Sequence, residues 1–151
     1  LKTAEADRVT NLMDYGVSLG RRFRALKLWF VLRWFGREGI ADAIREHVRL
    51  ARLFAGWVDD DPLFTRVAPT DLSVVAFRCA PPGETDGDRL DALNEAILRR
   101  VNASGEVFLS HTKVRGRHTI RLAIGNLRTR EEHVRRAWEL LRDAAAAELE
   151  A

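Results

Sequence analysis

The chain has 151 residues, of which 46% are hydrophobic and 31% are charged, and its formal net charge at pH 7 is +3. This length predicts one domain or a piece of a larger protein, and the hydrophobic content excludes a disordered chain. The single cysteine, Cys79, excludes a disulfide within the chain and a cysteine-based zinc site. We interpret it as a buried structural thiol.

The distribution of charged and apolar residues disfavours two classes of partner. Basic residues, nearly all arginine, alternate with Asp and Glu along the expected helices, which is typical of solvated helix faces and not of a nucleic-acid-binding stripe. The apolar run at residues 25–35 is too short for a membrane span and contains Lys27 and Arg33. We therefore expect a soluble protein of a reducing compartment, which we interpret as the cytoplasm, with neither nucleic acid nor membrane as a partner.

The first third of the chain centres on residues 19–35, LGRRFRALKLWFVLRWF, the densest apolar stretch of the sequence. Before it, residues 1–18 predict a loop with a short extended piece, and the start at Leu1 without methionine suggests an internal start. The pattern predicts a helix over residues 20–35. Because this helix is apolar on most sides, it must pack on nearly every face, much of it against residues outside this chain.

A second helix is expected after Gly36 and Gly39, which interrupt the first one. Residues 38–58 place apolar side chains at helical spacing, and the acidic run at residues 59–61 followed by Pro62 ends the helix. We interpret residues 1–61 as the end of a large domain with connecting helices. Residues 62–151 then form a small compact domain.

The small domain alternates strands and helices. Strands are expected at residues 64–67, 72–79, 106–113 and 118–124. Asp88 is the expected N-cap of a helix to residue 101, and Thr129 that of a helix to residue 148, with Glu132 completing a capping box. Residues 114–117 predict a hairpin with Gly116 at its tip. This order indicates an α+β fold, in which helices cover a small, mostly antiparallel sheet.

The sequence contains no complete catalytic set. No GxxxxGK phosphate loop occurs, and the four histidines lack metal-ligand spacing. His111 and His118 flank the hairpin, where a structural pair across the strands is expected. Two other positions stand out: Arg121, which alternation within its strand directs to solvent unless it reaches an anion in a cleft, and Gly20, where a ligand can approach the backbone.

Several segments together resemble one family. The segments are LMDYGVSLGRRFRALKLWFVLRWFG, IREHVRLARLF, DPLF, VAP and LNEAILRRVNASGEVFLSHTKVRGRHTIRLAIGNLRTREEHVRRAWELL. They resemble the C-terminal third of the pyridoxal-phosphate-dependent group II amino acid decarboxylases, in the aromatic-L-amino-acid decarboxylase branch. The likeness extends over nearly all of residues 1–141, in order and without large gaps.

The resemblance implies a fold-type-I pyridoxal enzyme. Such an enzyme has a large α/β domain, a small C-terminal α+β domain, and an active site at the interface of an obligate homodimer. This chain would be the end of the large domain, the connecting helix and the small domain, packed against the large domain of the same protein. The cofactor pyridoxal 5'-phosphate (PLP) and its lysine would lie upstream, because Lys2, Lys27 and Lys113 are outside the family's lysine motif.

Two positions carry over from the family to this sequence. Gly20 matches a glycine that lines the pocket for the substrate side chain, where a larger residue would change the ring preference. Arg121 matches an arginine on a small-domain strand near the active site, for which we expect a site-shaping role. A direct clamp on the scissile carboxylate is disfavoured, since over-stabilising the substrate does not raise the rate.

The resemblance therefore predicts part of an enzyme that converts an aromatic L-amino acid into its amine and carbon dioxide. Three alternatives stay open: a non-catalytic small domain that acts as an interaction module, an aldehyde-forming relative, and a decarboxylase of glutamate or diaminobutyrate. The GRRFRALKLW form of the motif argues against the last of these. No catalytic residue is expected within this segment.

Overall fold

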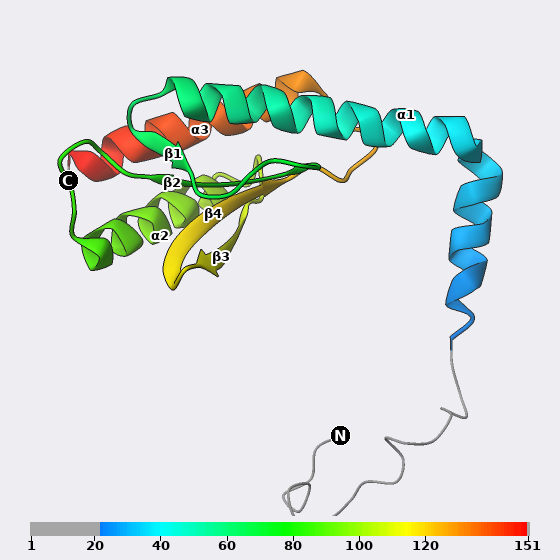
Figure 1. Cartoon of the computed structure of the whole chain (residues 1–151), viewed down its shortest axis with the longest axis horizontal. Coiled ribbons are helices and arrows are strands. Elements are labelled where there is room, and N and C mark those ends of the chain that lie inside the picture. Colours follow the sequence, from blue (N-terminus) through cyan, green and yellow to red (C-terminus); the bar gives the residue numbers. More distant parts are fainter. Residues whose placement is uncertain (1–21, 151) are drawn as a thin grey trace, which may run out of the picture. The chain divides into compact units, whose positions relative to one another are not determined.

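The computed structural model describes residues 22–150, and the prediction for residues 1–18 lies outside them (Figure 1). The chain divides into two compact units between Ile40 and Ala41. Helix α1, Arg24–Asp60, runs through this point and is interrupted at Gly36, whose φ of 66° and ψ of 177° are not helical. The predicted interruption by glycine is confirmed, while the predicted domain boundary between residues 61 and 62 stays a prediction.

In the first unit, Phe23 and the large apolar side chains of α1 as far as Phe35 are all exposed. Trp34 is 83% exposed, Phe23 is 74% exposed and Leu28 is 60% exposed. The remaining members of this exposed set are Leu26, Trp29, Phe30, Val31, Leu32 and Phe35. Within the described residues the helix therefore buries none of these side chains, as expected for a segment whose packing partners lie elsewhere.

The second unit contains a four-stranded antiparallel sheet (Figure 1). The strands are ordered β1-β2-β4-β3. Their bounds are Phe64–Arg66 for β1, Val74–Cys79 for β2, Ser110–Val114 for β3 and Arg117–Ala123 for β4. Helix α2, Gly87–Ala103, joins β2 to β3, and helix α3, Glu131–Leu149, follows β4. The predicted α+β fold and element order are confirmed.

The core lies on one face of this sheet. Val75 pairs with Leu122 and Phe77 pairs with Ile120 across β2 and β4, and all four side chains are buried. Cross-strand partners share a face, so these residues form one apolar layer. The helices pack on it with a further set of buried side chains, which includes Leu50, Phe54, Val58, Ile97, Val101 and Leu141.

An aromatic cluster joins α1 of the second unit to the sheet and to α3. The Phe54 ring lies 5.2 Å from the Phe77 ring and 5.6 Å from the Trp138 ring, both edge-on. Phe64 of β1 lies 5.0 Å from Trp138. Such pairs add about 0.5–1.5 kcal/mol each to the energy of burial.

The two predicted helix caps are wrong. Asp86, not Asp88, caps α2, because its extended backbone lets its carboxylate accept from the N–H groups of Asp88 and Arg89. Thr129 does not cap α3, since its own N–H closes a turn on the carbonyl of Asn126 and the helix begins at Glu131. The N–H of Arg130 instead donates to Nδ1 of His133 at 3.0 Å.

The third strand is shorter than predicted. It begins at Ser110 instead of residue 106, because Asn102 at the end of α2 takes both backbone groups of Leu109. The Asn102 side chain accepts from the Leu109 N–H at 2.8 Å and donates to its carbonyl at 3.0 Å. These groups are then not free for a sheet ladder. The predicted hairpin is confirmed, with positive φ at Arg115 and Gly116, the pattern that suits a two-residue turn.

Candidate functional site

Arg121 lies at the middle of β4, the strand that pairs with both β2 and β3. Its Cα partners are Ala76 on β2 and Ser110 on β3. Ile120 and Leu122, on either side of Arg121, point into the core. Because side chains alternate along a strand, Arg121 and its two partners lie on the opposite face of the sheet. Arg121 is half-buried, and its guanidinium forms no ion pair with any residue from 22 to 150.

The surroundings of Arg121 are small and weakly polar. Thr112 and Thr119 pair across β3 and β4 on the same face, and Val74 pairs with Ala123 beyond it. A guanidinium on such a floor can bind a carboxylate or phosphate through two parallel hydrogen bonds. None of these named neighbours is an acid, a base or an activated nucleophile, so what they offer a bound group is positioning.

Gly20, the other predicted site residue, lies outside the residues that the structure describes. Its role in a substrate pocket stays a prediction.

The described lysines do not fit a pyridoxal phosphate site. The cofactor requires a lysine for its Schiff base and a charged partner for its ring nitrogen. Lys27 on α1 and Lys113 on β3 are both exposed. Lys113 lies across from His118 at the outer strand of the sheet, and no ion pair joins it to residues 22–150. Neither lysine is therefore placed in a site that would enclose the cofactor.

The histidines are also placed for structural roles. Nε2 of His47 lies 3.2 Å from the carbonyl oxygen of Asn126, and His133 closes the start of α3. His111 and His118 stack with ring centroids 5.0 Å apart, which confirms the predicted pair across the strands. Within residues 22–150 no cluster of His, Cys, Asp and Glu is arranged to hold a metal ion. The same residues include no helix with the length and apolar character that crossing a membrane demands.

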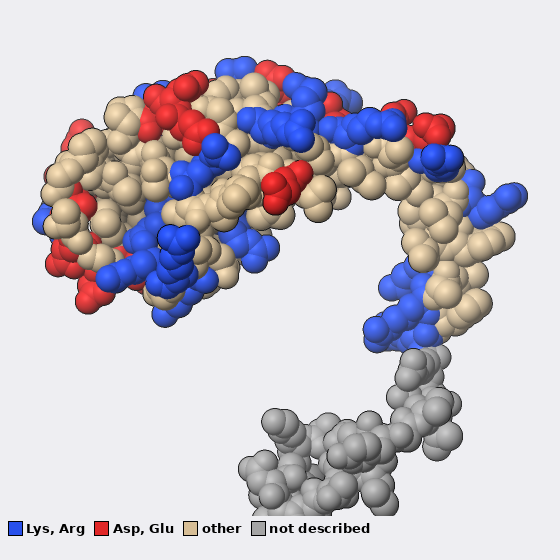
Figure 2. All heavy atoms as spheres, viewed as in Figure 1, with Lys and Arg blue, Asp and Glu red and all other residues tan. Residues whose placement is uncertain are grey.

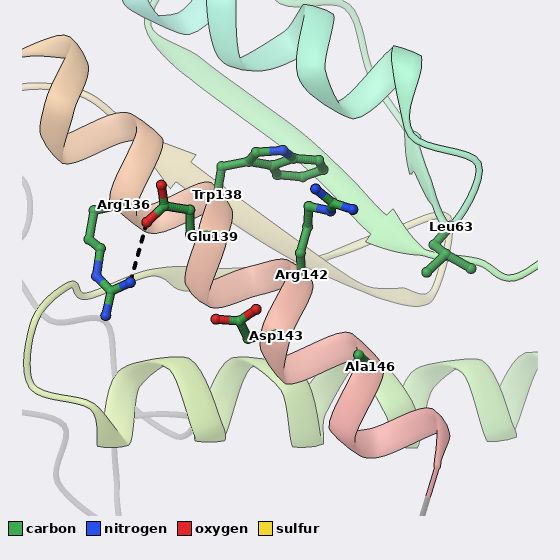
Figure 3. Close-up of a pocket in the computed structure, with 7 residues that line it drawn as sticks. All are labelled: Leu63, Arg136, Trp138, Glu139, Arg142, Asp143 and Ala146. Carbon is green, nitrogen blue, oxygen red and sulfur yellow. Dashed lines mark hydrogen bonds and ion pairs between the residues drawn. The ribbon is translucent and has the colours of Figure 1, made fainter.

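A hollow of about 430 Å³ lies along α3 in the second unit. Figure 3 shows its lining, in which Trp138 and Arg142 lie beside each other on α3. Its arginines are already paired: Nε of Arg136 lies 2.7 Å from Glu106, and Nε of Arg142 lies 3.2 Å from Asp61. A charged ligand would have to displace these partners, so the hollow is a poor candidate site.

Charges of both signs are interspersed over the surface shown in Figure 2. Several pairs join neighbouring turns of one helix, such as Arg135 with Glu131 at 3.1 Å and Arg49 with Glu46 at 2.8 Å. This pairing is the one predicted for solvated helix faces.

A buried ion pair was not predicted from the sequence. Arg78 of β2 is only 9% exposed, and its Nη2 donates to Asp91 of α2 at 2.6 Å. A charged residue inside the valine-rich strand was the available signal, the same signal that singled out Arg121. Which of the two arginines would be buried depended on a carboxylate from another element.

Comparison with known proteins identifies the family. Residues 1–80, just over half of the chain, match the family model described as "Pyridoxal-dependent decarboxylase conserved domain". The chain belongs to the pyridoxal-dependent decarboxylase family. The predicted family is thereby confirmed.

Individual relatives match over nearly the whole chain. A tryptophan decarboxylase of Camptotheca acuminata is 40% identical over 146 residues, which are 97% of this chain and 29% of that protein. The phenylacetaldehyde synthase of Arabidopsis thaliana is 39% identical over 145 residues, covering 96% and 29%. The crystal structure of Oryza sativa TDC with PLP and tryptamine superposes with a TM-score of 0.79 at 35% identity, covering 95% of this chain and 31% of that one.

The chain thus covers only part of its relatives. It spans about 30% of their length and corresponds to their C-terminal part. The predicted α+β small-domain fold agrees with the solved structure.

Proposed function

We propose that this chain is the C-terminal part of a PLP-dependent decarboxylase that converts an aromatic L-amino acid into its amine and carbon dioxide. The observation that carries the proposal is 40% identity to a tryptophan decarboxylase across 97% of the chain. PLP supplies an electron sink for the breaking bond when it is bound. The residues that hold PLP are proposed to lie in the rest of the protein, because Lys27 and Lys113 are exposed.

The partners follow from the same proposal. The exposed apolar side chains of residues 23–35 support packing against the large domain of the same protein, since an apolar surface of this kind marks an interaction site. A homodimer and a location in the cytoplasm are part of the proposal. So is the boundary between a connecting region at residues 1–61 and a small domain at residues 62–151.

The aldehyde-forming alternative has specific support. The phenylacetaldehyde synthase of Arabidopsis thaliana is nearly as similar to this chain as the tryptophan decarboxylase, at 39% identity. The small-domain residues therefore do not favour one outcome over the other. The products of the complete protein distinguish the two reactions.

The decisive experiment uses the complete protein encoded by the reading frame that contains this chain, purified with PLP. Tryptophan, tyrosine, phenylalanine and glutamate are supplied separately, and products are identified by mass spectrometry. An aromatic amine with carbon dioxide supports the proposal, and an aldehyde with consumption of oxygen supports the alternative. Turnover of glutamate alone, or a protein that neither binds PLP nor turns over any of the four, contradicts both.

Arg121 is proposed to shape the active site from the small domain. Its half-buried guanidinium without an ion-pair partner among residues 22–150 supports this role. In the complete protein we expect Arg121→Ala to lower kcat/KM by about tenfold to a hundredfold, because small displacements of a positioning group are costly to the rate.

Arg128→Ala is the matched control, since Arg128 is exposed in the loop before α3. Steady-state kinetics and the urea unfolding midpoint are measured for both variants. A loss in kcat without a change in unfolding midpoint indicates positioning. Normal kinetics together with normal stability in Arg121→Ala would make it an ordinary surface arginine.

A further inference from the structure

Two histidine rings lie against each other where the β3–β4 hairpin meets α2. The rings of His111 on β3 and His118 on β4 are 5.0 Å apart and nearly parallel, at 12°. In the strand register His111 is opposite Ile120, and His118 is opposite Lys113. The two histidines therefore lie diagonally on the face of the sheet that carries the core.

The two rings differ in burial. His111 is exposed, whereas His118 is only 9% exposed. Nε2 of His118 is buried and has no hydrogen-bond partner among the described residues. A neutral ring tolerates this because Nε2 can be the nitrogen without a proton. A second proton would place a buried donor and a charge where the described residues offer no acceptor.

Asp91 of α2 connects the helix to the strand that carries His118. Its Oδ1 accepts from the backbone N–H of His118 at 3.0 Å and from Nη2 of Arg78 at 2.6 Å. One carboxylate thus joins the start of α2 to β2 and β4. Movement of β4 away from α2 would break the bond to His118 and leave the Arg78–Asp91 pair in place. It would also separate Arg117 of β4 from Asp88 and Asp91 of α2, with which it pairs at 3.0 Å and 3.8 Å.

Charges of both signs face the His118 ring. The acidic groups, Asp91 and Glu95, come from α2. The cationic or titratable groups are Arg78 of β2, and His111 and the cross-strand neighbour Lys113 of β3. Burial is the largest influence on the pKa of His118 and lowers it. His111 and Arg78 lower this pKa further, whereas the two carboxylates raise it. These influences together lower the pKa of His118, so the folded protein favours the neutral ring more than a free imidazole does.

We propose that the His111–His118 stack is an acid-sensitive joint, in which protonation of His118 separates the β3–β4 hairpin from α2. A protonated His118 can reach water only by moving out from beneath α2. A positive charge on His118 is further opposed by His111 at the stacking distance of 5.0 Å. The bond from the His118 N–H to Asp91 then breaks, and the amide becomes open to solvent.

The direction of the pH dependence follows from linkage. His118 has a lower pKa in the folded protein than its ordinary value of about 6.5. The closed joint therefore binds fewer protons than the open one, and closing is favoured above about pH 6.5. That preference is lost as the pH falls from this value through the folded-state pKa.

Hydrogen–deuterium exchange of the full chain tests the proposal between pH 7.5 and pH 5. Exchange is corrected for the intrinsic pH dependence and read from peptides that cover β3 and β4. We expect protection to fall by up to about tenfold for each pH unit below about 6.5, until the folded-state pKa of His118 is reached. His118→Gln should abolish this fall, and His47→Gln, at a histidine elsewhere in the fold, should retain it.

His111→Gln is the second variant, because this exposed position can change without disturbing the core. It removes the neighbour that opposes a positive charge on His118, so the loss of protection at pH 5 should be smaller than in the unmodified chain. If His118→Gln does not fold, this variant decides. A fall that persists unchanged in His118→Gln or in His111→Gln overturns the proposal, as does an unmodified chain without any fall.

Discussion

The two halves of α1 use apolar residues in different ways. Residues 24–35 are almost continuously apolar, yet their large side chains are exposed in the first unit. Residues 41–60 carry fewer large apolar side chains, but a set of apolar residues at helical spacing is buried in the second unit: Leu50, Ala51, Phe54, Ala55 and Val58. Apolar content alone therefore does not decide whether a side chain is buried. Burial requires apolar spacing that matches a partner surface within the described residues.

The largest expected effect comes from removing one aromatic ring in each half. Phe54 is fully buried between Phe77 and Trp138, so Phe54→Ala should lower the free energy of unfolding by about 3–5 kcal/mol. Phe30 is 58% exposed, so Phe30→Ala should change it by less than about 0.5 kcal/mol. Urea unfolding followed by fluorescence and circular dichroism measures both.

The same pair tests the role of the exposed half. Phe30→Ala should reduce self-association of the chain, measured by sedimentation velocity, because it removes part of the apolar surface. Equal destabilisation by the two substitutions would show that residues 24–35 contribute to a core, and would break the contrast between the halves.

A smaller effect is expected at the two glycines between the halves. Gly36 has φ 66° and ψ 177°, a region that is essentially limited to glycine, so Gly36→Ala should destabilise by about 1–3 kcal/mol. At Gly39 an added Cβ would meet only the Cβ of Phe35 at 3.6 Å, and Gly39→Ala should stabilise the helix by about 0.5–1 kcal/mol.

Thermal unfolding followed at 222 nm compares these two variants. Opposite shifts in the melting midpoint are expected. A rise in helix content and midpoint for both variants would mean that α1 can continue through Gly36 as a regular helix.

The smallest effect concerns ion pairs of α1. At its end, Nε and Nη2 of Arg66 donate to the two carboxylate oxygens of Asp59, each at 2.6 Å. Asp59→Asn should cost about 0.5–1 kcal/mol, the upper range for a partly exposed pair. Asp42→Asn, which removes a more exposed pair with Arg45 at 2.7 Å, should cost about 0.3 kcal/mol or less.

Chemical denaturation in low and high salt measures both changes. The Asp59 effect should persist better in salt, because its two parallel bonds fix the geometry. Equal and fully salt-sensitive effects would place both pairs among ordinary surface charges.

Patterns that involve neighbours in the sequence were predicted correctly. The glycine interruption of α1, the hairpin at residues 114–117 and the alternation in β4 each depend on a few adjacent residues. The wrong predictions arose where another polar group within a few residues satisfied the backbone in a way that the pattern did not specify. Asn102 took the polar groups of Leu109 and shortened β3, and a turn at Asn126 displaced Thr129 from the start of α3.

The candidate site shows the same division. Arg121 could be selected from the sequence as a charge within an apolar strand, but its half-burial depended on the sheet register with Ala76 and Ser110. The stack of His111 and His118 was predicted as a pair, whereas its unpartnered, buried Nε2 could not be. Burial depends on what packs above a strand, which local patterns do not specify.

By itself, the sequence determined the order of helices and strands, the α+β class and the resemblance to the decarboxylases, because each depends on spacing along the chain. Only the tertiary structure decided the fates of Arg78 and Arg121, two arginines on adjacent strands. Asp91 of α2 reaches Arg78 at 2.6 Å, so that charge is compensated and can be buried. No carboxylate among residues 22–150 pairs with Arg121, and it stays half-exposed because an uncompensated charge is too costly to bury.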